Sequence, residues 1–288
     1  MSRVGIGSRI GSGSASFVCG AAVLWAAMGC DTISQDFSAF TEELMPPTPT
    51  EAARLMIDPH DPDNRRRGAL MISNSPFGGA DPYLNVYRDM AIRERDPLAK
   101  AAGLMALGRH GIPDDAVIIA ASLDDENLQV KWAAAQALQR IHNPAVVADL
   151  LEVLRRDEEQ TDTRIAAAVA VGQYAQDRVF QGLISALDDR ELALNLTALT
   201  SLQTLTGEDF GLEARAWLAW YNDSAEPFAG QREYLYPTYQ RDETWLERLA
   251  FWSSTTFEQP GPPAGLRPAG ERRTYEDDDE MKPDESGG

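Results

Sequence analysis

The sequence predicts an all-α protein, an α-solenoid of about five helical hairpins, and two observations lead to this fold class. One ten-residue pattern returns five times between residues 64 and 203. The last residues of the copies lie 35, 31, 33 and 31 positions apart, and a fixed period of this length is typical of stacked repeats. The five copies are 64–73 (NRRRGALMIS), 99–108 (AKAAGLMALG), 130–139 (VKWAAAQALQ), 163–172 (TRIAAAVAVG) and 194–203 (LNLTALTSLQ).

Each copy has the pattern of a helix that packs closely on its neighbours. Small or apolar residues recur at helical spacing, as in Ala102, Met105 and Ala106. Asp-Pro precedes two copies, at Asp61 and Asp96, where Asp can cap a helix and Pro fits its first turn. We expect a second apolar helix after each copy, so that every unit is helix, turn, helix. These second helices are expected at 83–92, 116–123, 144–154, 179–187 and 210–221.

The string DPLAKAAGLMALG at residues 96–108 and its echoes resemble HEAT repeats of the short kind seen in the phycobiliprotein-lyase family. The resemblance extends over roughly half of the chain, from Asp61 to about Tyr221. It implies an array of hairpins with an extended surface for protein recognition. HEAT arrays have many functions, so the resemblance indicates no particular partner.

The composition of the chain limits which partners it can bind and which chemical sites it can form. The chain has 288 residues, 43% of them hydrophobic, which is ample for one continuous core in a single array. Its formal net charge of -19 disfavours a nucleic-acid partner, because an acidic surface repels phosphate backbones. Both cysteines, Cys19 and Cys30, fall within the first thirty residues. The rest of the chain therefore has no thiol for a disulfide, a metal site or a nucleophile.

The start of the chain has the pattern of a bacterial export signal. Residues 15–29 are uncharged and mostly apolar, which is short for a membrane span but suits the core of a signal peptide. Ala27-Met28-Gly29-Cys30 resembles a lipobox, so we expect a signal peptide at 1–29, lipidation of Cys30, and a lipid-anchored location at the bacterial cell envelope, facing the periplasm or the exterior. An uncleaved signal anchor, ordinary secretion or a misread start are the alternatives.

The remaining segments have distinct compositions. We expect a lipidated, Pro-rich linker at 30–50, the repeat array at 51–222, and a first helix at 51–57 with Thr50 as its N-cap. An aromatic segment follows at 223–257, in which Trp245, Leu249 and Trp252 share one face of a possible helix. This segment either folds back onto the array or contacts a partner or the membrane interface. We expect the acidic tail at 258–288 to be disordered.

The sequence offers little for catalysis or metal binding. The three histidines, His60, His110 and His142, lie in expected turns. The HEAT-like di-iron hydroxylases hold their metal with His-Glu pairs, whereas Asp61, Gly111 and Asn143 follow the histidines here. There is no G-x-S-x-G motif, and phycobilin lyase activity makes little sense for an exported chain. We therefore expect no enzyme activity, no catalytic residue, no metal, no cofactor and no small-molecule substrate.

A basic residue occupies the second position of four copies. These residues are Arg65, Lys100, Lys131 and Arg164, and the fifth copy has Asn195 there. Stacked one per repeat, they could form a stripe that grips an acidic segment of a partner. They could instead form an internal ladder by pairing with the Asp of an adjacent turn, namely Asp61, Asp96, Asp125 or Asp162.

Together these features predict a membrane-anchored HEAT-type scaffold that binds an unidentified protein partner at the bacterial envelope. One alternative is a structural envelope component that associates with itself through the aromatic segment. Another is a non-catalytic subunit of a soluble enzyme complex.

Overall fold

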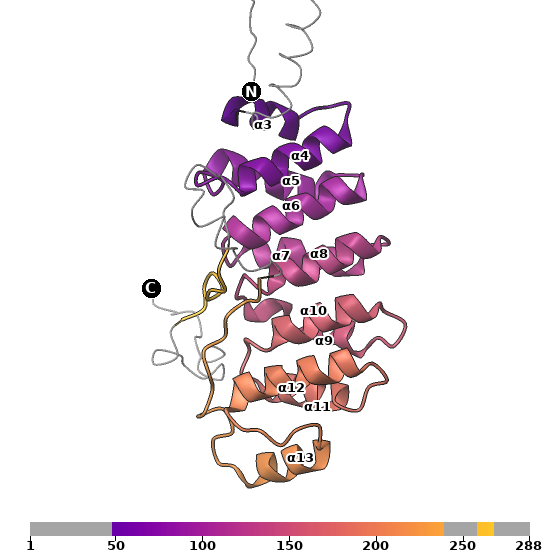
Figure 1. Cartoon of the computed structure of the whole chain (residues 1–288), viewed down its shortest axis with the longest axis vertical. Helices are drawn as coiled ribbons and strands as arrows, with labels where there is room; N and C mark the ends of the chain where they lie inside the picture. The colour runs from indigo at the N-terminus through magenta and orange to yellow at the C-terminus, as the bar shows by residue number, and fades with distance from the viewer. Residues whose placement is uncertain (1–47, 239–257, 268–288) are drawn as a thin grey trace, which may run out of the picture. The chain divides into compact units, whose positions relative to one another are not determined.

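The computed structural model describes residues 48–238 and 258–267 of the chain. From Pro49 to Asp223 this part of the chain consists of eleven α-helices and two short 3-10 helices, labelled in Figure 1. The predicted all-α repeat fold is therefore confirmed. Residues 1–47, 239–257 and 268–288 lie outside the description, and with them Cys30, most of the 30–50 linker, Trp245, Leu249 and Trp252.

The five sequence copies form one layer of stacked helices, which we call the A layer. Each of its helices contains one copy to within one residue, and consecutive members pack directly on each other. The A layer consists of α4 (Pro62–Ser73), α6 (Pro97–His110), α8 (Leu128–Leu138), α10 (Thr161–Val171) and α12 (Leu192–Thr206).

The second helices of the hairpins form the B layer, which packs behind the A layer. Its members lie close to the expected positions. They are α5 (Asp81–Arg93), α7 (Asp115–Ala120) continued by η1 (Ala121–Asp124), η2 (Pro144–Val146) leading into α9 (Val147–Arg155), α11 (Asp177–Ala186) and α13 (Ala214–Asp223). Before the first hairpin in the chain, α3 (Pro49–Met56) packs on α4. Because α3 begins at Pro49, Thr50 lies inside its first turn, so the predicted N-cap is wrong.

The Asp-Pro pairs begin two A-layer helices as expected. Asp61 Oδ1 accepts a hydrogen bond from the Asp63 amide at 2.9 Å. Asp96 Oδ1 accepts from the Leu98 amide at 3.0 Å and from the Ala99 amide at 2.9 Å. Both carboxylates thereby satisfy amides that have no partner within the helix.

Small residues let the A-layer helices approach each other with their backbones. A Cβ atom added at Gly108 of α6 would lie 2.7 Å from Ala137 Cα of α8. The alanines between residues 133 and 137 of α8 are themselves buried. The recurrence of Ala and Gly in the copies therefore reflects the close spacing of neighbouring repeats.

Aromatic side chains cover the last hairpin. Trp217 of α13 is fully buried, and its ring centroid lies 5.0 Å from that of Phe210 and 6.4 Å from that of Phe180. Its indole Nε1 donates to the Gly211 carbonyl oxygen at 2.9 Å. An end repeat has no following neighbour, and these rings supply the apolar area that would otherwise come from one.

After α13 the described chain returns along the array. The Arg232 amide donates to the Thr204 carbonyl at 2.8 Å, and the Tyr236 amide donates to the Gly261 carbonyl at 2.9 Å. Residues 258–267, which we call the strap, lie beside the C-terminal ends of α6 and α8, as the gold segment of Figure 1 shows. Part of the aromatic segment, 224–238, therefore contacts the array.

The expectation of disorder is wrong for the strap. The Ala264 amide donates to the Arg140 carbonyl at 2.8 Å, and the His142 amide donates to the Ala264 carbonyl at 2.8 Å. Gly265 has a positive φ of 88°, and a Cβ there would lie 2.6 Å from the Pro113 ring. These backbone contacts with the array order a segment whose composition alone is typical of disorder.

Among the residues that the structure describes, no helix is both long and apolar enough to span a membrane.

Candidate functional site

The four basic residues of the A layer form ion pairs from one repeat to the next. Arg65 contacts Glu94 through two hydrogen bonds, Nε to Oε2 at 2.6 Å and Nη2 to Oε1 at 2.8 Å. The other three pairs are Lys100 Nζ to Asp125 Oδ2 at 2.7 Å, Lys131 Nζ to Glu159 Oε2 at 2.6 Å, and Arg164 Nη2 to Asp189 Oδ2 at 2.6 Å. In each pair, the acid lies in the turn that precedes the next A-layer helix.

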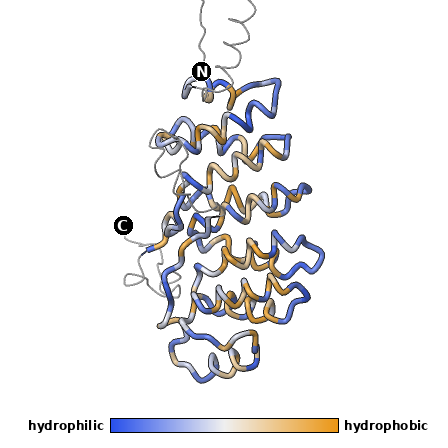
Figure 2. Tube along the Cα trace, viewed as in Figure 1, coloured by the Kyte–Doolittle hydropathy of each residue, from blue (hydrophilic) through white to orange (hydrophobic). Residues whose placement is uncertain are grey.

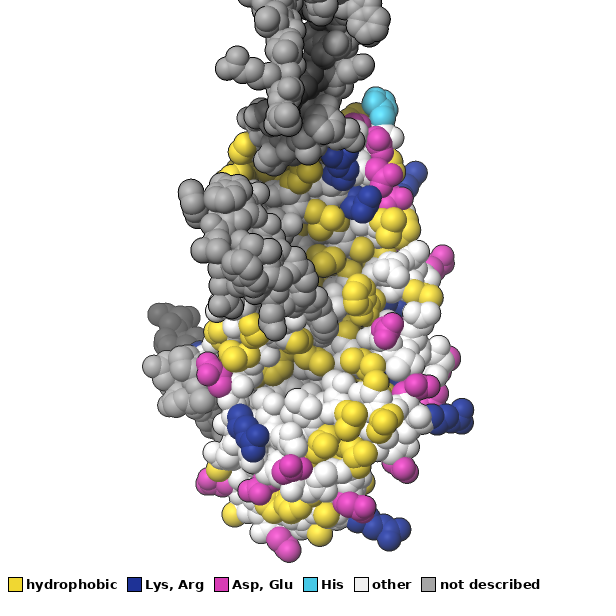
Figure 3. All heavy atoms as spheres, in the orientation of Figure 1, with side chains coloured by type: hydrophobic (Ala, Val, Ile, Leu, Met, Phe, Trp, Pro, Cys, Tyr) yellow, Lys and Arg dark blue, Asp and Glu magenta, His cyan; other side chains and the backbone are white. Residues whose placement is uncertain are grey.

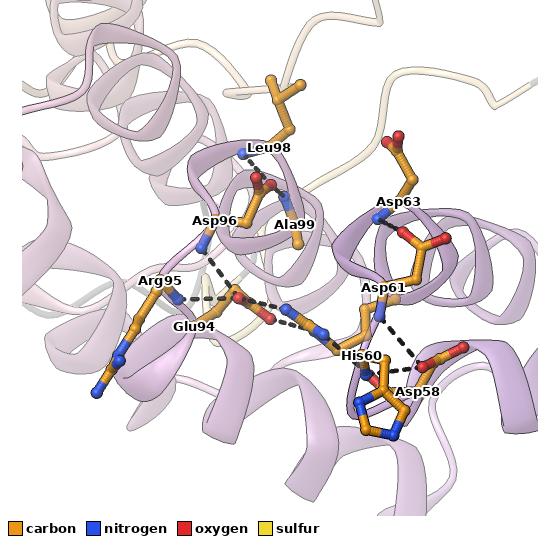
Figure 4. Close-up of polar contacts among 10 residues, drawn as sticks. Asp58, His60, Asp61, Asp63, Glu94, Arg95, Asp96, Leu98 and Ala99 are labelled. Carbon is orange, nitrogen blue, oxygen red and sulfur yellow. Dashed lines mark hydrogen bonds and ion pairs between the residues drawn. The ribbon is translucent and has the colours of Figure 1, made fainter.

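Each of these acids also holds its own turn in shape. Glu94 Oε1 accepts hydrogen bonds from the amides of Arg95 and Asp96, at 2.9 and 3.0 Å, as Figure 4 shows. The other three acids use the oxygen that does not face the base. Asp125 Oδ1 accepts from Asn127, Glu159 Oε1 from Gln160, and Asp189 Oδ1 from Glu191, at 2.9 to 3.1 Å. One carboxylate therefore shapes a turn and joins it to the preceding repeat.

These contacts favour the charged form of the acids. The hydrogen bond from Arg65 lowers the pKa of Glu94 below its usual 4.5. Burial, the largest single cause, would raise the pKa values of Asp125 and Asp189, but the hydrogen bonds from Lys100 and Arg164, together with backbone hydrogen bonds and the nearby positive charges, bring both pKa values below the usual 3.8. Glu94, Asp125 and Asp189 are therefore held in their charged form at neutral pH.

We call the four ion pairs Arg65–Glu94, Lys100–Asp125, Lys131–Glu159 and Arg164–Asp189 the ladder. The basic side chains of the ladder are largely buried. Their exposed fractions run from 8% for Arg164 to 20% for Arg65. Of the two interpretations, internal pairing fits this geometry, and a free binding stripe does not. Three of the expected acceptors are wrong: Asp61 and Asp96 cap helices, and Asp162 is an exposed residue in the first turn of α10, while Asp125 is the acceptor for Lys100.

Different groups stand at the two ends of the ladder. At the first end, Asp58 accepts from the amides of His60 and Asp61 and from Asn64 Nδ2, at 2.8 to 3.2 Å. The backbone hydrogen bond from His60 is the main cause that lowers the pKa of Asp58. At the last end, Asn195 replaces the base and donates to the Asp189 carbonyl at 3.1 Å. Neutral amides thus finish the series on the described array.

The outward face of the A layer is apolar. Between Thr163 and Val171 of α10, the residues that are not buried are Ile165 and Val169, four positions apart on one face. Trp132 of α8 is half-buried at the position that matches Ile165, and Met105 of α6 is 45% exposed at the position that matches Val169. We define the A face by six side chains, Leu98, Met105, Trp132, Ile165, Val169 and Leu196.

The B layer has a different exterior. Its exposed positions are mainly polar, for example Asn85, Asp89, Glu152, Gln181 and Ser185. A helix that buries one stripe normally presents such polar residues to water, whereas a helix that is apolar all round is normally covered on all sides. In Figure 2 much of α6, α8, α10 and α12 has hydrophobic colours, whereas α4 is mixed, and Figure 3 shows apolar side chains gathered between charged groups on this view. The A face is therefore the more apolar of the two exteriors of the described array.

Two of the three histidines contact neighbouring repeats. His110 Nε2 lies 2.6 Å from the Ser73 carbonyl oxygen, and His142 Nδ1 lies 3.1 Å from Gln173 Oε1. The His142 ring also stacks on Tyr174 with 4.7 Å between centroids. Within 48–238 and 258–267, no three His, Cys, Asp or Glu side chains are grouped so that they could hold a metal ion.

A second charged cluster joins the strap to the array, and no pattern in the sequence predicted it. Glu258 pairs with Arg140 of the α8 C-terminal end and, at 3.1 Å, with Arg109 Nη2 of α6. Burial, the largest single cause, would raise the pKa of Glu258, but the hydrogen bonds and positive charges of Arg140 and Arg109 together lower it. The Arg140 guanidinium also lies 4.6 Å from the centre of the Tyr236 ring.

A family model of helical repeats matches part of the array. Residues 84–161 and residues 116–203 each match the family model of HEAT repeats. Among solved structures, the chain is similar to the X-ray structure of YibA from Escherichia coli, with 18% sequence identity and a TM-score of 0.46. The match covers 61% of this chain and 63% of YibA, so the chain spans less than two thirds of that protein's length. Among curated proteins, none matches the sequence.

HEAT repeats generally mediate contacts between proteins, and a module built from them is of the protein-interaction or scaffold type. The matched segment, residues 84–203, contains four of the five sequence copies and three complete ladder pairs. Residues 84–203 are therefore a segment of HEAT repeats within an all-α repeat array.

Proposed function

We propose that the chain is a membrane-anchored, non-catalytic scaffold that binds a protein partner through the A face at the bacterial envelope. The single observation that carries the binding role is the contrast between the layers. Ile165, Val169, Met105 and Trp132 are outward groups of A-layer helices whose central residues are mostly buried. The exposed positions of the B layer are mainly polar, with Ile92, Val117 and Leu218 as the large apolar exceptions. Apolar groups gathered on one face of a repeat array are typical of a surface that another chain covers.

The charges beside the A face indicate the chemistry of the partner. The turns before α8, α10 and α12 carry exposed acids in addition to those of the ladder: Glu126, Glu158 and Asp188. An amphipathic helix with an apolar stripe and basic flanks would match both features, because its stripe can lie on the A face while Lys or Arg side chains face these turns.

Surface substitutions on the two layers test the binding role. Met105→Lys and Leu196→Lys replace side chains that are 45% and 49% exposed, and Val117→Lys replaces a B-layer side chain that is 55% exposed. Full-length variants would be crosslinked in the native host, and the proteins bound to wild type would then be purified and titrated directly. We expect the two A-face variants to weaken binding about tenfold or more, and Val117→Lys to leave it unchanged. Equal binding by all variants would contradict the proposal.

The anchoring role is supported by the sequence alone. Residues 15–29 have the pattern of a signal-peptide core, and Cys30 ends the lipobox-like string. Membrane fractionation of wild type and Cys30→Ala, with radiolabelled palmitate on the same samples, tests it. We expect label and membrane association to be lost together on substitution. A soluble, unlabelled wild type would favour the alternative of a subunit in a soluble complex.

Self-association is the second candidate for the A face. Sedimentation of the purified full chain separates it from the proposed function, since a partner of another kind leaves the isolated protein monomeric. Crosslinks that are exclusively homotypic would favour the structural envelope component.

A further inference from the structure

The strap lies in a site whose groups come from residues that precede it in the chain. The Ala264 amide donates to the Arg140 carbonyl oxygen, and the Ala264 carbonyl accepts from the His142 amide, both at 2.8 Å. Three residues earlier, the Gly261 carbonyl accepts from the Tyr236 amide at 2.9 Å. The strap is therefore held through its backbone, in the way that an extended peptide adds to the edge of a sheet.

One acidic side chain of the strap neutralises two arginines of the array. Glu258 Oε2 accepts from Arg140 Nη2 at 2.9 Å and from Arg109 Nη2 at 3.1 Å. The two arginines belong to consecutive repeats, and no other carboxylate of residues 48–238 or 258–267 forms an ion pair with either of them. Because two like charges lie close together here, the site favours a carboxylate between them.

The shape of the site selects particular residues farther along the strap. Pro263 is the one buried residue of the strap. Gly265 has a positive φ of 88°, and a Cβ there would lie 2.6 Å from the Pro113 ring. A Cβ at Gly261 would lie 3.1 Å from the Tyr236 hydroxyl oxygen. The site thus fits a segment with the pattern Glu-x2-Gly-x-Pro-x-Gly, in which the glycines avoid strain and close contacts.

The strap itself is held by few contacts. Six of its ten residues are exposed, and a segment with so little buried surface opens locally at a low cost in free energy. Opening makes the Arg140 carbonyl, the His142 amide and the two guanidinium groups accessible to any other extended segment of the same pattern. The strap can therefore be replaced at this site without unfolding the repeats.

We propose that this site binds an extended segment of a protein partner with the pattern Glu-x2-Gly-x-Pro-x-Gly, and that the strap is its competitor within the chain. We call it the strap site, and its residues are Arg109, Pro113, Arg140, His142 and Tyr236. It includes none of the six side chains that define the A face, so it does not rest on the proposed function. The strap lowers the apparent affinity of the partner by the fraction of chains in which the site is open.

Titration of the full chain with a peptide tests the strap site. The probe is a fluorescent peptide with the sequence of residues 258–267. The double variant Glu258→Gln/Ala264→Pro removes the charge of the strap and one backbone donor. We expect this variant to bind the peptide about tenfold more tightly than wild type, and added Arg140→Gln to abolish the gain. Equal binding by wild type and the double variant, or binding that is insensitive to Arg140→Gln, would overturn the proposal.

Peptide variants test the predicted pattern. A peptide with Ala in place of Gly265 should bind the double variant about tenfold more weakly, because the new methyl group meets Pro113 and the positive φ becomes strained. A peptide with Ala in place of Gln259 is the matched control, since that position is exposed in the strap. Equal affinities of the two peptides would show that the site does not select the glycine.

Hydrogen exchange locates the bound peptide. In the double variant, the His142 amide should exchange faster than in wild type, and added peptide should slow it again while the amides of α12 stay unchanged. Peptide binding without this protection would place the peptide elsewhere and overturn the proposal. Sedimentation identifies the remaining alternative. A wild-type dimer that the double variant dissociates would make the strap of a second copy the occupant and would overturn the assignment to a protein partner, whereas a wild-type monomer supports that assignment.

Discussion

Lys131 Nζ lies 2.6 Å from Glu159 Oε2, and the carboxylate side chain that it contacts is only 3% exposed. Replacing Lys131 by Met leaves that carboxylate buried without its charge partner, which costs about 3 to 5 kcal/mol of unfolding free energy at such sites. We expect Lys131→Met to lower the free energy of unfolding by an amount near the lower end of this range. The loss is not larger because Lys131 itself is partly exposed. Urea denaturation followed by circular dichroism measures the change.

The matched variant for this ion pair removes both charges. Lys131→Met/Glu159→Gln is expected to recover at least half of the loss, since no buried charge then remains. The surface pair of Asp89 and Arg93, with 55% and 78% exposure, is a second control, and Arg93→Ala is expected to change stability by about 0 to 1 kcal/mol. Equal losses in the single and double variants would show that the Lys131–Glu159 pair is unimportant.

Acid weakens the array through the ladder carboxylates. The pKa values of Glu94, Asp125 and Asp189 are lowered in the folded chain from their usual 4.5 and 3.8. The unfolded chain therefore takes up protons first as the pH falls, and the stabilisation is complete above about pH 4.5 and is lost as the pH falls through the folded pKa values. Urea midpoints measured between pH 7 and pH 3 should fall in the lower half of this range.

The double variant Arg65→Met/Glu94→Gln provides the control for the acid effect. Because it lacks one lowered carboxyl pKa, its urea midpoint should depend less on pH than that of wild type. A steeper dependence in the variant would contradict the assignment.

Gly108→Ala is expected to separate two A-layer helices. The added Cβ would lie 2.7 Å from Ala137 Cα, and such overpacking costs about 1 to 3 kcal/mol. The gain in helix propensity from Gly to Ala, about 0.5 to 1 kcal/mol, offsets only part of that cost. Thermal unfolding measures the net loss. Gly79→Ala is the control, because its nearest neighbour is the His110 side chain at 3.3 Å; a loss as large there would refute the steric explanation.

Glu258→Gln is expected to loosen the strap. It removes the negative charge that faces Arg109 and Arg140. Hydrogen exchange should become about tenfold faster at the amides of Ala264 and His142, which bridge the strap and the array. Exchange in α12 serves as the internal reference and should stay unchanged. Unaltered exchange at Ala264 would mean that the backbone contacts alone hold the strap.

The periodic sequence predicted the A layer well because each copy has the same neighbours. The ladder acceptors were harder to assign. Asp61 and Asp96 stand directly before a helix and look like partners, but the backbone amides of the first turn occupy their oxygens. The true acceptors have a signal of their own, because an acid lies five or six residues before the second position of each later copy, as Glu94 does before Lys100.

The strap and the A face depended on information that local composition does not contain. Pro263 is buried and Ala264 pairs with backbone groups more than a hundred residues away, although this stretch has the Pro and Gly content of a disordered tail. The A face could not be predicted from the sequence for another reason. Ile165 and Ala166 are both apolar in the sequence, and only the packing of the layers distinguishes the outward residue from the buried one.

Each repeat of the ladder has one acid and one base, and these two residues belong to two different ion pairs. The acid that precedes an A-layer helix faces the base behind it, and the base within that helix faces the acid ahead, as for Glu94 and Lys100. A tandem copy of residues 94–124, inserted after Asp124, would therefore meet a matching charge on both sides. The array can in this way grow or shrink by whole repeats without leaving any carboxylate unmatched, while the amides of Asn64 and Asn195 remain at its ends.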